Sequence, residues 1–382
     1  MLPARARHVD CCRDLDMAIS DGTYGVSPRE QHTLTERERE ILRLVVKSFI
    51  ETAGPVGSRY LAKTARLGLS PASIRNTMSD LEEYGLLDHP YTSAGRVPTE
   101  LGYRTFVDEL MDSPTLSEPE KQVLRAEVER LMGNPEELLR ESSRLLGRFS
   151  NLLGVVLSPK LSAGILERME VVQLSTSRVM FVVSVRGGLV KTIILELESD
   201  LDRRNLDRVV GILNERLAGL TLEEIRNTYT SRVHDLRDDQ SGIVRLILNE
   251  GALLFSDPSE NRRLQYAGTQ NILLQPEFQE PSDLRSLIEM LEDEDFVVHM
   301  LEDRRSVDDM SGHATIRIGR ENIDEKAERY SIVTAPYRIG RAVGTVGIVG
   351  PMRMDYERVI ALVENMAKLL NRTETDEGDS RS

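Results

Sequence analysis

Residues 54–99 have the sequence GPVGSRYLAKTARLGLSPASIRNTMSDLEEYGLLDHPYTSAGRVPT, and the helix and turn signals within them decide the class of fold. Ser70-Pro71 can begin a helix, because a cap residue is followed by proline at the first helical position. Gly85 stands where a left-handed residue would end that helix. Two short extended pieces then flank a turn of small residues at 93–95. With helices predicted before and after it, this stretch predicts a winged helix-turn-helix over residues 33–112.

The helix that follows the proline has two distinct faces. Ile74, Met78 and Leu81 recur at helical spacing, so we expect them to pack inward. Arg75 and Asn76 lie on the opposite face. Arginine can form paired hydrogen bonds with guanine, and asparagine can do so with adenine. We therefore predict that this helix enters the major groove of DNA.

The charge pattern of the stretch also favours DNA. From Gly54 to Ser79 the chain carries basic residues and no acidic residue, whereas an ordinary amphipathic domain would mix both signs. Ser70 would bring the positive N-terminus of the helix near the DNA backbone, where phosphate binds well. Arg96 on the thin hairpin suits a phosphate or the narrow minor groove, and Gly95 would give the turn its backbone freedom.

The expected DNA contacts fall into two groups. We predict that Arg75 and Asn76 contact bases, and that Arg59 and Lys63 mainly hold phosphates. The alternative is a helical module that uses its hairpin to contact another protein. The residues expected at the DNA are Ser58, Arg59, Lys63, Ser70, Ser73, Arg75, Asn76, Ser79, Ser93 and Arg96.

The rest of the chain changes its period twice. Runs of β-branched residues begin near Leu152, give way to helical patterns from about Leu206 to Asp303, and return from Thr315. Strands on both sides of a helical block predict an α+β, multidomain chain in which one α/β domain contains an inserted domain. The expected division is a disordered leader at 1–32, the winged helix-turn-helix at 33–112, a helical linker at 113–150, the α/β domain at 151–205 and 280–372, the inserted domain at 206–279 and a disordered tail at 373–382.

Length and composition exclude other classes. The chain has 382 residues and a net charge of −14, which argues against nucleic acid along the whole surface but allows one basic face. Its apolar runs are too short for a transmembrane helix, and its N-terminus lacks the pattern of a signal peptide. We therefore expect a cytoplasmic protein without a membrane partner. Cys11 and Cys12 are adjacent and enclose no loop, which argues against a disulfide scaffold.

The chain shows no motif for catalysis, a cofactor or a metal. The glycines between Gly340 and Gly350 lack the dinucleotide-binding spacing, and no phosphate-binding Gly-Lys-Ser/Thr occurs. Only His8 lies near other soft metal ligands, Cys11 and Cys12, and that cluster has no second half. No nucleophile elbow is present. We therefore expect no enzyme, no cofactor and no metal.

Two runs of the chain are especially specific, TSAGRVPT at 92–99 and GPMRMDY at 350–356. Together with several shorter motifs they resemble those of HrcA, the heat-inducible repressor of bacterial chaperone operons. The resemblance spans residues 34–371 in order, whereas residues 1–32 depart from the family. The other motifs that resemble the family are GPVGS at 54–58, SPASIRNTM at 70–78, LEEYGL at 81–86, GYR at 102–104, YAGTQNIL at 266–273 and IGREN at 318–322.

This resemblance implies a winged-helix domain, a GAF-like domain and an inserted dimerisation domain. It implies a homodimer that binds an inverted-repeat operator upstream of chaperone genes and releases it on heat stress. It also implies that the chaperonin GroEL favours the active repressor. Because a single winged helix contacts only a few base pairs, we expect a dimer contact in the helical residues 206–278.

Two other functions remain open. A GAF-like fold commonly binds small molecules, so the alternative is a ligand-responsive winged-helix regulator with an effector site within residues 150–200 or 315–350. Against it, those ranges contain no convergent polar cluster. The third class is an enzyme with a regulatory winged helix. That class requires a compact set of titratable residues in the α/β part, and the sequence shows none.

Overall fold

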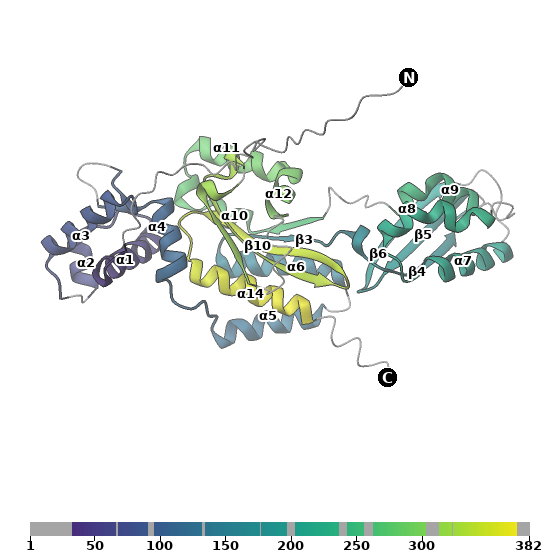
Figure 1. Ribbon diagram of the computed structural model, residues 1–382, viewed down its shortest axis with the longest axis horizontal. Coiled ribbons are helices and arrows are strands. Elements are labelled where there is room, and N and C mark those ends of the chain that lie inside the picture. The colour runs from purple at the N-terminus through teal and green to yellow at the C-terminus, as the bar shows by residue number, and fades with distance from the viewer. Residues whose placement is uncertain are drawn as a thin grey trace, which may run out of the picture.

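The structure, a computed structural model, consists of three bodies arranged in a row (Figure 1). A helical module at the N-terminal end is followed by a central sheet covered with helices, and a smaller sheet with its own helices lies at the far end. The expected leader and tail, residues 1–32 and 373–382, lie outside the described residues. The structure describes residues 33–65, 68–90, 95–131, 134–175, 177–196, 203–236, 243–255, 263–302, 313–322 and 324–372.

The N-terminal module contains the helices and the hairpin that its sequence predicts. Ser70 Oγ accepts a hydrogen bond from Ser73 N (3.1 Å), which confirms the predicted cap. Gly85 has a φ of 75°, as predicted for the residue that ends this helix. The elements are α1 (Glu36–Thr52), α2 (Ser58–Thr64), α3 (Pro71–Glu83), β1 (Leu87–Asp88), β2 (Val97–Pro98), α4 (Glu100–Thr105) and the π-helical turn η1 (Phe106–Leu110).

The central body is built on a five-stranded antiparallel sheet with the order β7-β3-β10-β9-β8. β9 and β10 are buried along nearly their whole length, because helices cover both faces of the sheet. Its strands are β3 (Leu153–Leu157), β7 (Leu264–Ala267), β8 (Thr315–Ile318), β9 (Tyr330–Ile339) and β10 (Ala342–Pro351).

Two groups of helices cover this sheet. α5 (Glu118–Arg130), α6 (Pro135–Ser150) and α14 (Tyr356–Arg372) share a core with Val156, Val333 and Ile348 on one face. Leu153, Ile332 and Val349 point to the other face. The elements on that side are α10 (Thr269–Leu273), η5 (Pro276–Phe278), α11 (Pro281–Glu292) and α12 (Glu294–Leu301), and the short turns η6 (Gly319–Glu321) and η7 (Glu325–Ala327) connect β8 to β9.

The inserted module is a three-stranded antiparallel sheet, β4-β5-β6, with helices on one face. Phe181, Leu213, Ile225 and Ile247 form its core, which is separate from the cores of the central body. Its elements are η2 (Leu161–Ala163), β4 (Leu166–Gln173), β5 (Arg178–Val185), β6 (Leu189–Glu196), α7 (Arg203–Leu217), α8 (Leu222–Val233), η3 (His234–Leu236) and α9 (Ile243–Leu254).

This topology differs from the division expected from the sequence. Residues 151–205 were expected in one domain with residues 280–372, but only β3 of that range joins the central sheet. β7 falls in the range 206–279 expected for the insert, yet it pairs with β3. The expected linker, residues 113–150, contains α5 and α6, which pack on the central body. A run of β-branched residues predicts a strand, but it does not say which sheet the strand joins.

Candidate nucleic-acid interface

The two faces of α3 lie as the sequence predicts. Ile74, Met78 and Leu81 are buried against the other helices of the module. Arg75 and Asn76 are exposed on the opposite side. The helix therefore presents a guanidinium and a carboxamide to solvent on a rigid, well-packed support.

The N-terminal turn of α3 receives a cation that the sequence analysis missed. The guanidinium of Arg37, near the start of α1, donates to Ser73 Oγ (2.6 Å) and to the Ser73 carbonyl (2.9 Å). Arg37 is exposed, and Ser73 is half-buried. Because α1 is distant from α3 in the sequence, no local pattern signals this contact. The Ser73 hydroxyl is thus already bound within the protein, and Arg37 adds positive charge beside it.

The remaining predicted residues have different environments. Arg59 and Lys63 are exposed on α2, which packs against α3. Ser58 is the first residue of α2 and is half-buried, while the N-cap position belongs to Gly57. Ser70 is exposed and Ser79 is half-buried, and Ser93 lies outside the described residues.

The sequence predicts that Arg96 lies at the hairpin tip and is available to DNA, but the structure places its side chain against α3. Its backbone pairs with Val56, with N···O distances of 2.8 and 2.9 Å. Its guanidinium forms an ion pair with Glu82 Oε2 (2.6 Å), and its side chain is 20% exposed. Its Nε is buried and has no hydrogen-bond partner among the residues that the structure describes. Glu82 also contacts His89 Nδ1 (2.5 Å), so the end of α3 contacts the residues at both ends of the hairpin loop.

Gly95 is required because of close backbone packing, and not because of the backbone freedom that the sequence predicts. It is absent from the glycines with positive φ, so backbone freedom does not explain it. Instead, a Cβ at this position would overlap the carbonyl group of Val56 and the amide of Gly57. Two backbone segments cross at this point, and only a hydrogen fits between them.

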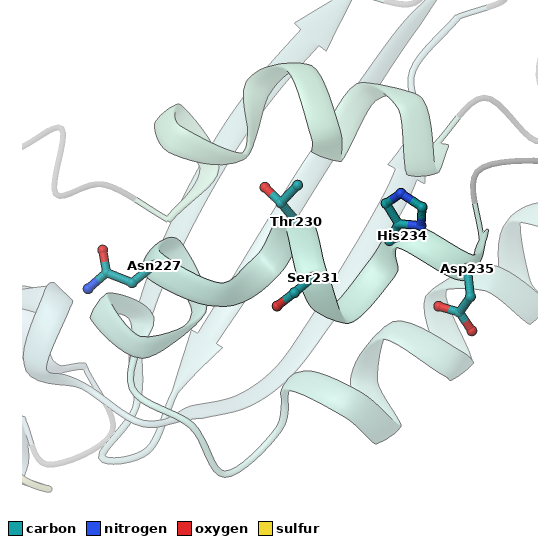
Figure 2. Close-up of a pocket in the computed structure, with 5 residues that line it drawn as sticks. All are labelled: Asn227, Thr230, Ser231, His234 and Asp235. Carbon is teal, nitrogen blue, oxygen red and sulfur yellow. The ribbon is translucent and has the colours of Figure 1, made fainter.

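Two hollows lie away from this interface. A cavity of about 580 Å³ lies between the inserted module and the central body, and its lining includes Lys191 and Arg263, each only 4% exposed. Figure 2 shows an open groove along α8 and η3, lined by small polar residues and His234. In that groove Asp235 already accepts two bonds from Arg216 (2.6 and 2.8 Å), and Ser231 donates to Thr228 O (2.8 Å).

Metal and membrane features give no further candidate. Within the described ranges, no cluster of three or more His, Cys, Asp and Glu side chains is arranged to bind a metal ion. None of the helices in that part of the chain is long and apolar enough to span a membrane.

Comparison with known proteins gives one family and one fold. The family described as HrcA protein C terminal domain matches residues 136–360. A heat-inducible transcription repressor HrcA from Chlorobium phaeobacteroides (strain BS1) is 41% identical over 346 residues, which cover 89% of this chain and 98% of that protein. The protein of the same name from Chlorobium chlorochromatii (strain CaD3) is 43% identical over 342 residues, with 89% and 97% coverage. A crystal structure described as that of a hypothetical protein has a TM-score of 0.59 at 23% identity, covering 90% of this chain and 99% of that one.

These relatives and the multidomain α+β fold define the class: the chain is a transcription repressor. It belongs to the HrcA family of heat-inducible transcription repressors. The likeness to the crystal structure supports the fold alone. The family is one of regulators rather than of enzymes.

Proposed function

We propose that the chain represses chaperone genes in the cytoplasm by binding an inverted-repeat operator as a homodimer. The N-terminal module acts as a winged helix-turn-helix, and α3 enters the major groove. The observation that carries this proposal is the face of α3, where Arg75 and Asn76 are exposed while Ile74, Met78 and Leu81 hold the helix in place. Arginine and asparagine are the side chains best suited to guanine and adenine.

The other interface residues support this helix. Arg59 and Lys63 on α2 contact phosphates, and the capped N-terminus at Ser70 points to the DNA backbone. Ser58, Ser73, Ser79 and Ser93 complete the contact surface. Arg96 contributes mainly through Glu82, because its guanidinium faces α3.

The dimer contact is best supported on the open face of the inserted sheet. Val172, Met180 and Ile194 lie side by side in the strand register, and Val182 and Val190 extend the same face. The helices of the module lie on the opposite side. Val190 is 57% exposed, Ile194 48% and Val172 42%, so a contiguous apolar surface faces solvent in one chain. A second copy of the chain would cover it through a two-fold contact, as an inverted-repeat operator requires. The inserted module is then the dimerisation domain, and the central body is the GAF-like domain.

Footprinting with the full chain upstream of the organism's own chaperonin operon tests the operator. Protection of two symmetric half-sites is expected, and protection of no sequence above random DNA would contradict the proposal. Sedimentation tests the dimer face: Ile194→Asp should give a monomer, because a buried charge without a partner is costly. Leu274→Asp is the matched control, since Leu274 is 77% exposed on the central body.

Heat release and chaperonin control complete the proposal. Mild heating lowers the fraction of folded dimer and frees the operator, because one or two kcal/mol, about the size of the change needed, shifts the folded fraction several-fold. Operator binding should fall on heating and return when GroEL and ATP are added. Heat loss that GroEL does not reverse would contradict this part alone.

A second candidate function rests on the cavity between the inserted module and the central body. Two nearly buried cations, Lys191 and Arg263, line it, and the N-terminus of α6 at Pro135 faces the same space. Arg263 already pairs with Glu302 (2.7 Å), and Lys191 donates to the carbonyls of Leu253 and Leu254, so the cavity favours a polar small-molecule effector rather than a strongly anionic one. Native mass spectrometry of the purified chain distinguishes the two candidates, because an effector-dependent regulator should carry a bound small molecule and a repressor controlled by folding alone should not.

A further inference from the structure

Several motifs of the chain lie far from α3, and contact with DNA does not explain them. They are GYR at 102–104, IGREN at 318–322 and GPMRMDY at 350–356. The structure brings all three together where α4 and the end of α1 meet the central body. We name this region the junction and define it by Ile50, Tyr103, Arg104, Glu321, Arg353 and Tyr356.

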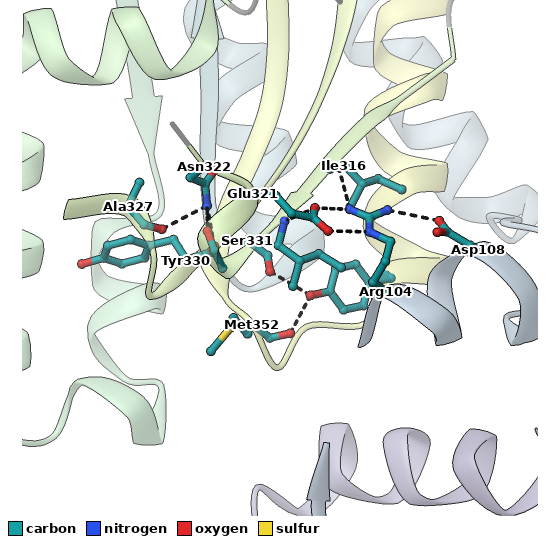
Figure 3. A network of polar contacts seen from close by, with 12 residues as sticks. Arg104, Asp108, Ile316, Glu321, Asn322, Ala327, Tyr330, Ser331 and Met352 are labelled. Carbon is teal, nitrogen blue, oxygen red and sulfur yellow. Dashed lines mark hydrogen bonds and ion pairs between the residues drawn. The ribbon is translucent and has the colours of Figure 1, made fainter. Parts of the chain in front are cut away.

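The first contact of the junction is an arginine held by four acceptor atoms. Arg104 on α4 donates from Nε to Glu321 Oε1 (2.7 Å) and from a terminal nitrogen to the second oxygen of the same carboxylate. It also donates to the Ile316 carbonyl (2.9 Å) and to Asp108 (3.1 Å). Figure 3 shows these bonds joining α4 to the loop after β8. A paired arginine–carboxylate contact fixes direction as well as distance.

Hydrogen bonds of Glu321 and Asn322 anchor the described part of the loop that presents Glu321. Asn322 is 5% exposed, and its amide nitrogen lies 2.8, 3.0 and 2.9 Å from the carbonyls of Gly319, Ala327 and Tyr330 (Figure 3). Glu321 itself accepts from Ile318 N (2.8 Å). Both ends of the Arg104–Glu321 contact are therefore fixed to their own modules.

The second contact is formed by a largely buried arginine that donates to the last turn of α1. Arg353 follows β10 and is 11% exposed, and it donates twice to Glu277 (2.6 and 3.1 Å) and once to Gln275 (3.0 Å). Its remaining terminal nitrogen donates to the carbonyl of Ile50 (2.8 Å), in the last turn of α1. Such carbonyls have no partner within their helix, and α1 has no basic residue of its own in that turn. The central body thus supplies the cation that the helix lacks.

Buried aromatic rings fill the space between these two contacts. Tyr103 of α4 and Tyr356 of α14 have ring centroids 6.0 Å apart, and both are buried. Burial raises the pKa of Tyr356, so its hydroxyl stays protonated and donates to Met352 O (2.7 Å). Tyr103, Phe106 and Tyr356 belong to one continuous core that includes both modules.

From this geometry we infer that Arg104, Glu321 and Arg353 are positioning residues, which fix the direction of α3 on the central body and thereby set the spacing between the operator half-sites. The inference rests on the proposed function, since it concerns a dimer on an inverted repeat. In such a dimer the separation of the two DNA-binding helices determines which half-site spacing fits. A loosened junction would let each module take many directions, which lowers the effective concentration of the second module at any one spacing.

The test measures binding of the full chain to inverted-repeat duplexes that differ only in the number of base pairs between their half-sites. The wild-type chain should prefer one spacing sharply. For Glu321→Gln and Arg353→Gln, we expect roughly tenfold weaker binding at that spacing, a flatter dependence on spacing, and unchanged binding to a duplex with one half-site. Arg130→Gln is the matched control, because Arg130 pairs with Glu127 on the exposed side of α5.

The outcomes of this test distinguish a positioning role of the junction from a merely structural one. A merely structural role would weaken binding to every duplex by the same factor, so a folded variant whose spacing profile equals that of the wild type overturns the inference. A variant that binds its best duplex more tightly would show that the junction opposes DNA binding, which also overturns it. If the wild-type chain binds none of the duplexes, the proposed function fails and the inference fails with it. Should Arg353→Gln not fold, Glu321→Gln carries the test, since Glu321 lies on a surface loop with its side chain 39% exposed.

Discussion

The N-terminal module and the inserted module are attached to the same central body by different means. The N-terminal module shares one hydrophobic core with it, and the largely buried Arg353 joins the two. The inserted module has its own core around Phe181 and Leu213, and a cavity of about 580 Å³ lies between it and the body. Domains are coupled by the surface that they bury together and not by the covalent connection between them. The N-terminal module is therefore fixed in direction on the central body, whereas the inserted module is a separate folding unit.

The largest expected effect is on the free energy of unfolding, which should change separately for the inserted module and for the rest of the chain. Phe181→Ala removes a fully buried ring from the inserted module and should cost about 3–5 kcal/mol of its free energy of unfolding. Differential scanning calorimetry should show two transitions, of which only the one belonging to the inserted module moves. Ile74→Ala, in the core of the N-terminal module, should move only the other transition. Equal shifts of both transitions by both variants would contradict the comparison.

The second prediction breaks the hairpin without touching the inserted module. Gly95→Val places a branched side chain where the backbone of Val56 already lies, so the hairpin must shift at a cost of about 1–3 kcal/mol. Operator affinity, measured by fluorescence anisotropy, should fall roughly fivefold or more, since 1.4 kcal/mol corresponds to a factor of ten. Sedimentation should still show the dimer. A folded variant with unaltered affinity would remove the hairpin from DNA binding.

The third prediction distinguishes base contact from phosphate contact within the N-terminal module. Arg75→Ala should cost about 1–3 kcal/mol on the operator and relax the preference at one base position in each half-site. Lys63→Ala should weaken operator and random DNA alike and reduce the slope of log affinity against log salt by about 1. Neither change should move either calorimetric transition, because both side chains are exposed. If Arg75→Ala alters neither operator nor random binding, the assigned face of α3 is wrong.

The smallest expected effect concerns the ion pair between Arg96 and Glu82. Because the two side chains act as one unit, Arg96→Ala and Glu82→Ala should each weaken operator binding by about 1 kcal/mol, and the double variant by no more than one of them. The salt slope of Arg96→Ala should equal that of the wild type. A lower slope together with full additivity would show instead that Arg96 contacts a phosphate.

Local signals explain what the sequence predicted correctly. The cap at Ser70, the left-handed Gly85 and the buried side of α3 each depend on residues within one or two turns of each other. Such features are set by backbone geometry and helical period, which are visible in a single sequence.

Contacts between distant segments explain what the sequence did not predict. Arg37 reaches Ser73 from another helix, and Arg96 pairs through its backbone with Val56 and through its guanidinium with Glu82. The observed topology differs from the expected division for the same reason, since β-branched runs predict β3 and β4–β6 alike as strands but do not say that they belong to different sheets. Side-chain direction and sheet membership depend on tertiary packing, which periodicity does not encode.

The pairing of β3 with β10 also has a consequence for how the chain folds during synthesis. β3 is synthesised before the inserted module and β10 after it, so the central sheet cannot be completed until nearly the whole polypeptide has been made. The hydrophobic core that Tyr103 of α4 shares with Tyr356 is also incomplete until α14, the last helix, has been synthesised. Such long-range pairing slows folding and leaves apolar strands exposed meanwhile. The yield of native protein is therefore expected to depend on how much chaperone capacity the cell has free. This dependence follows from the topology of the fold.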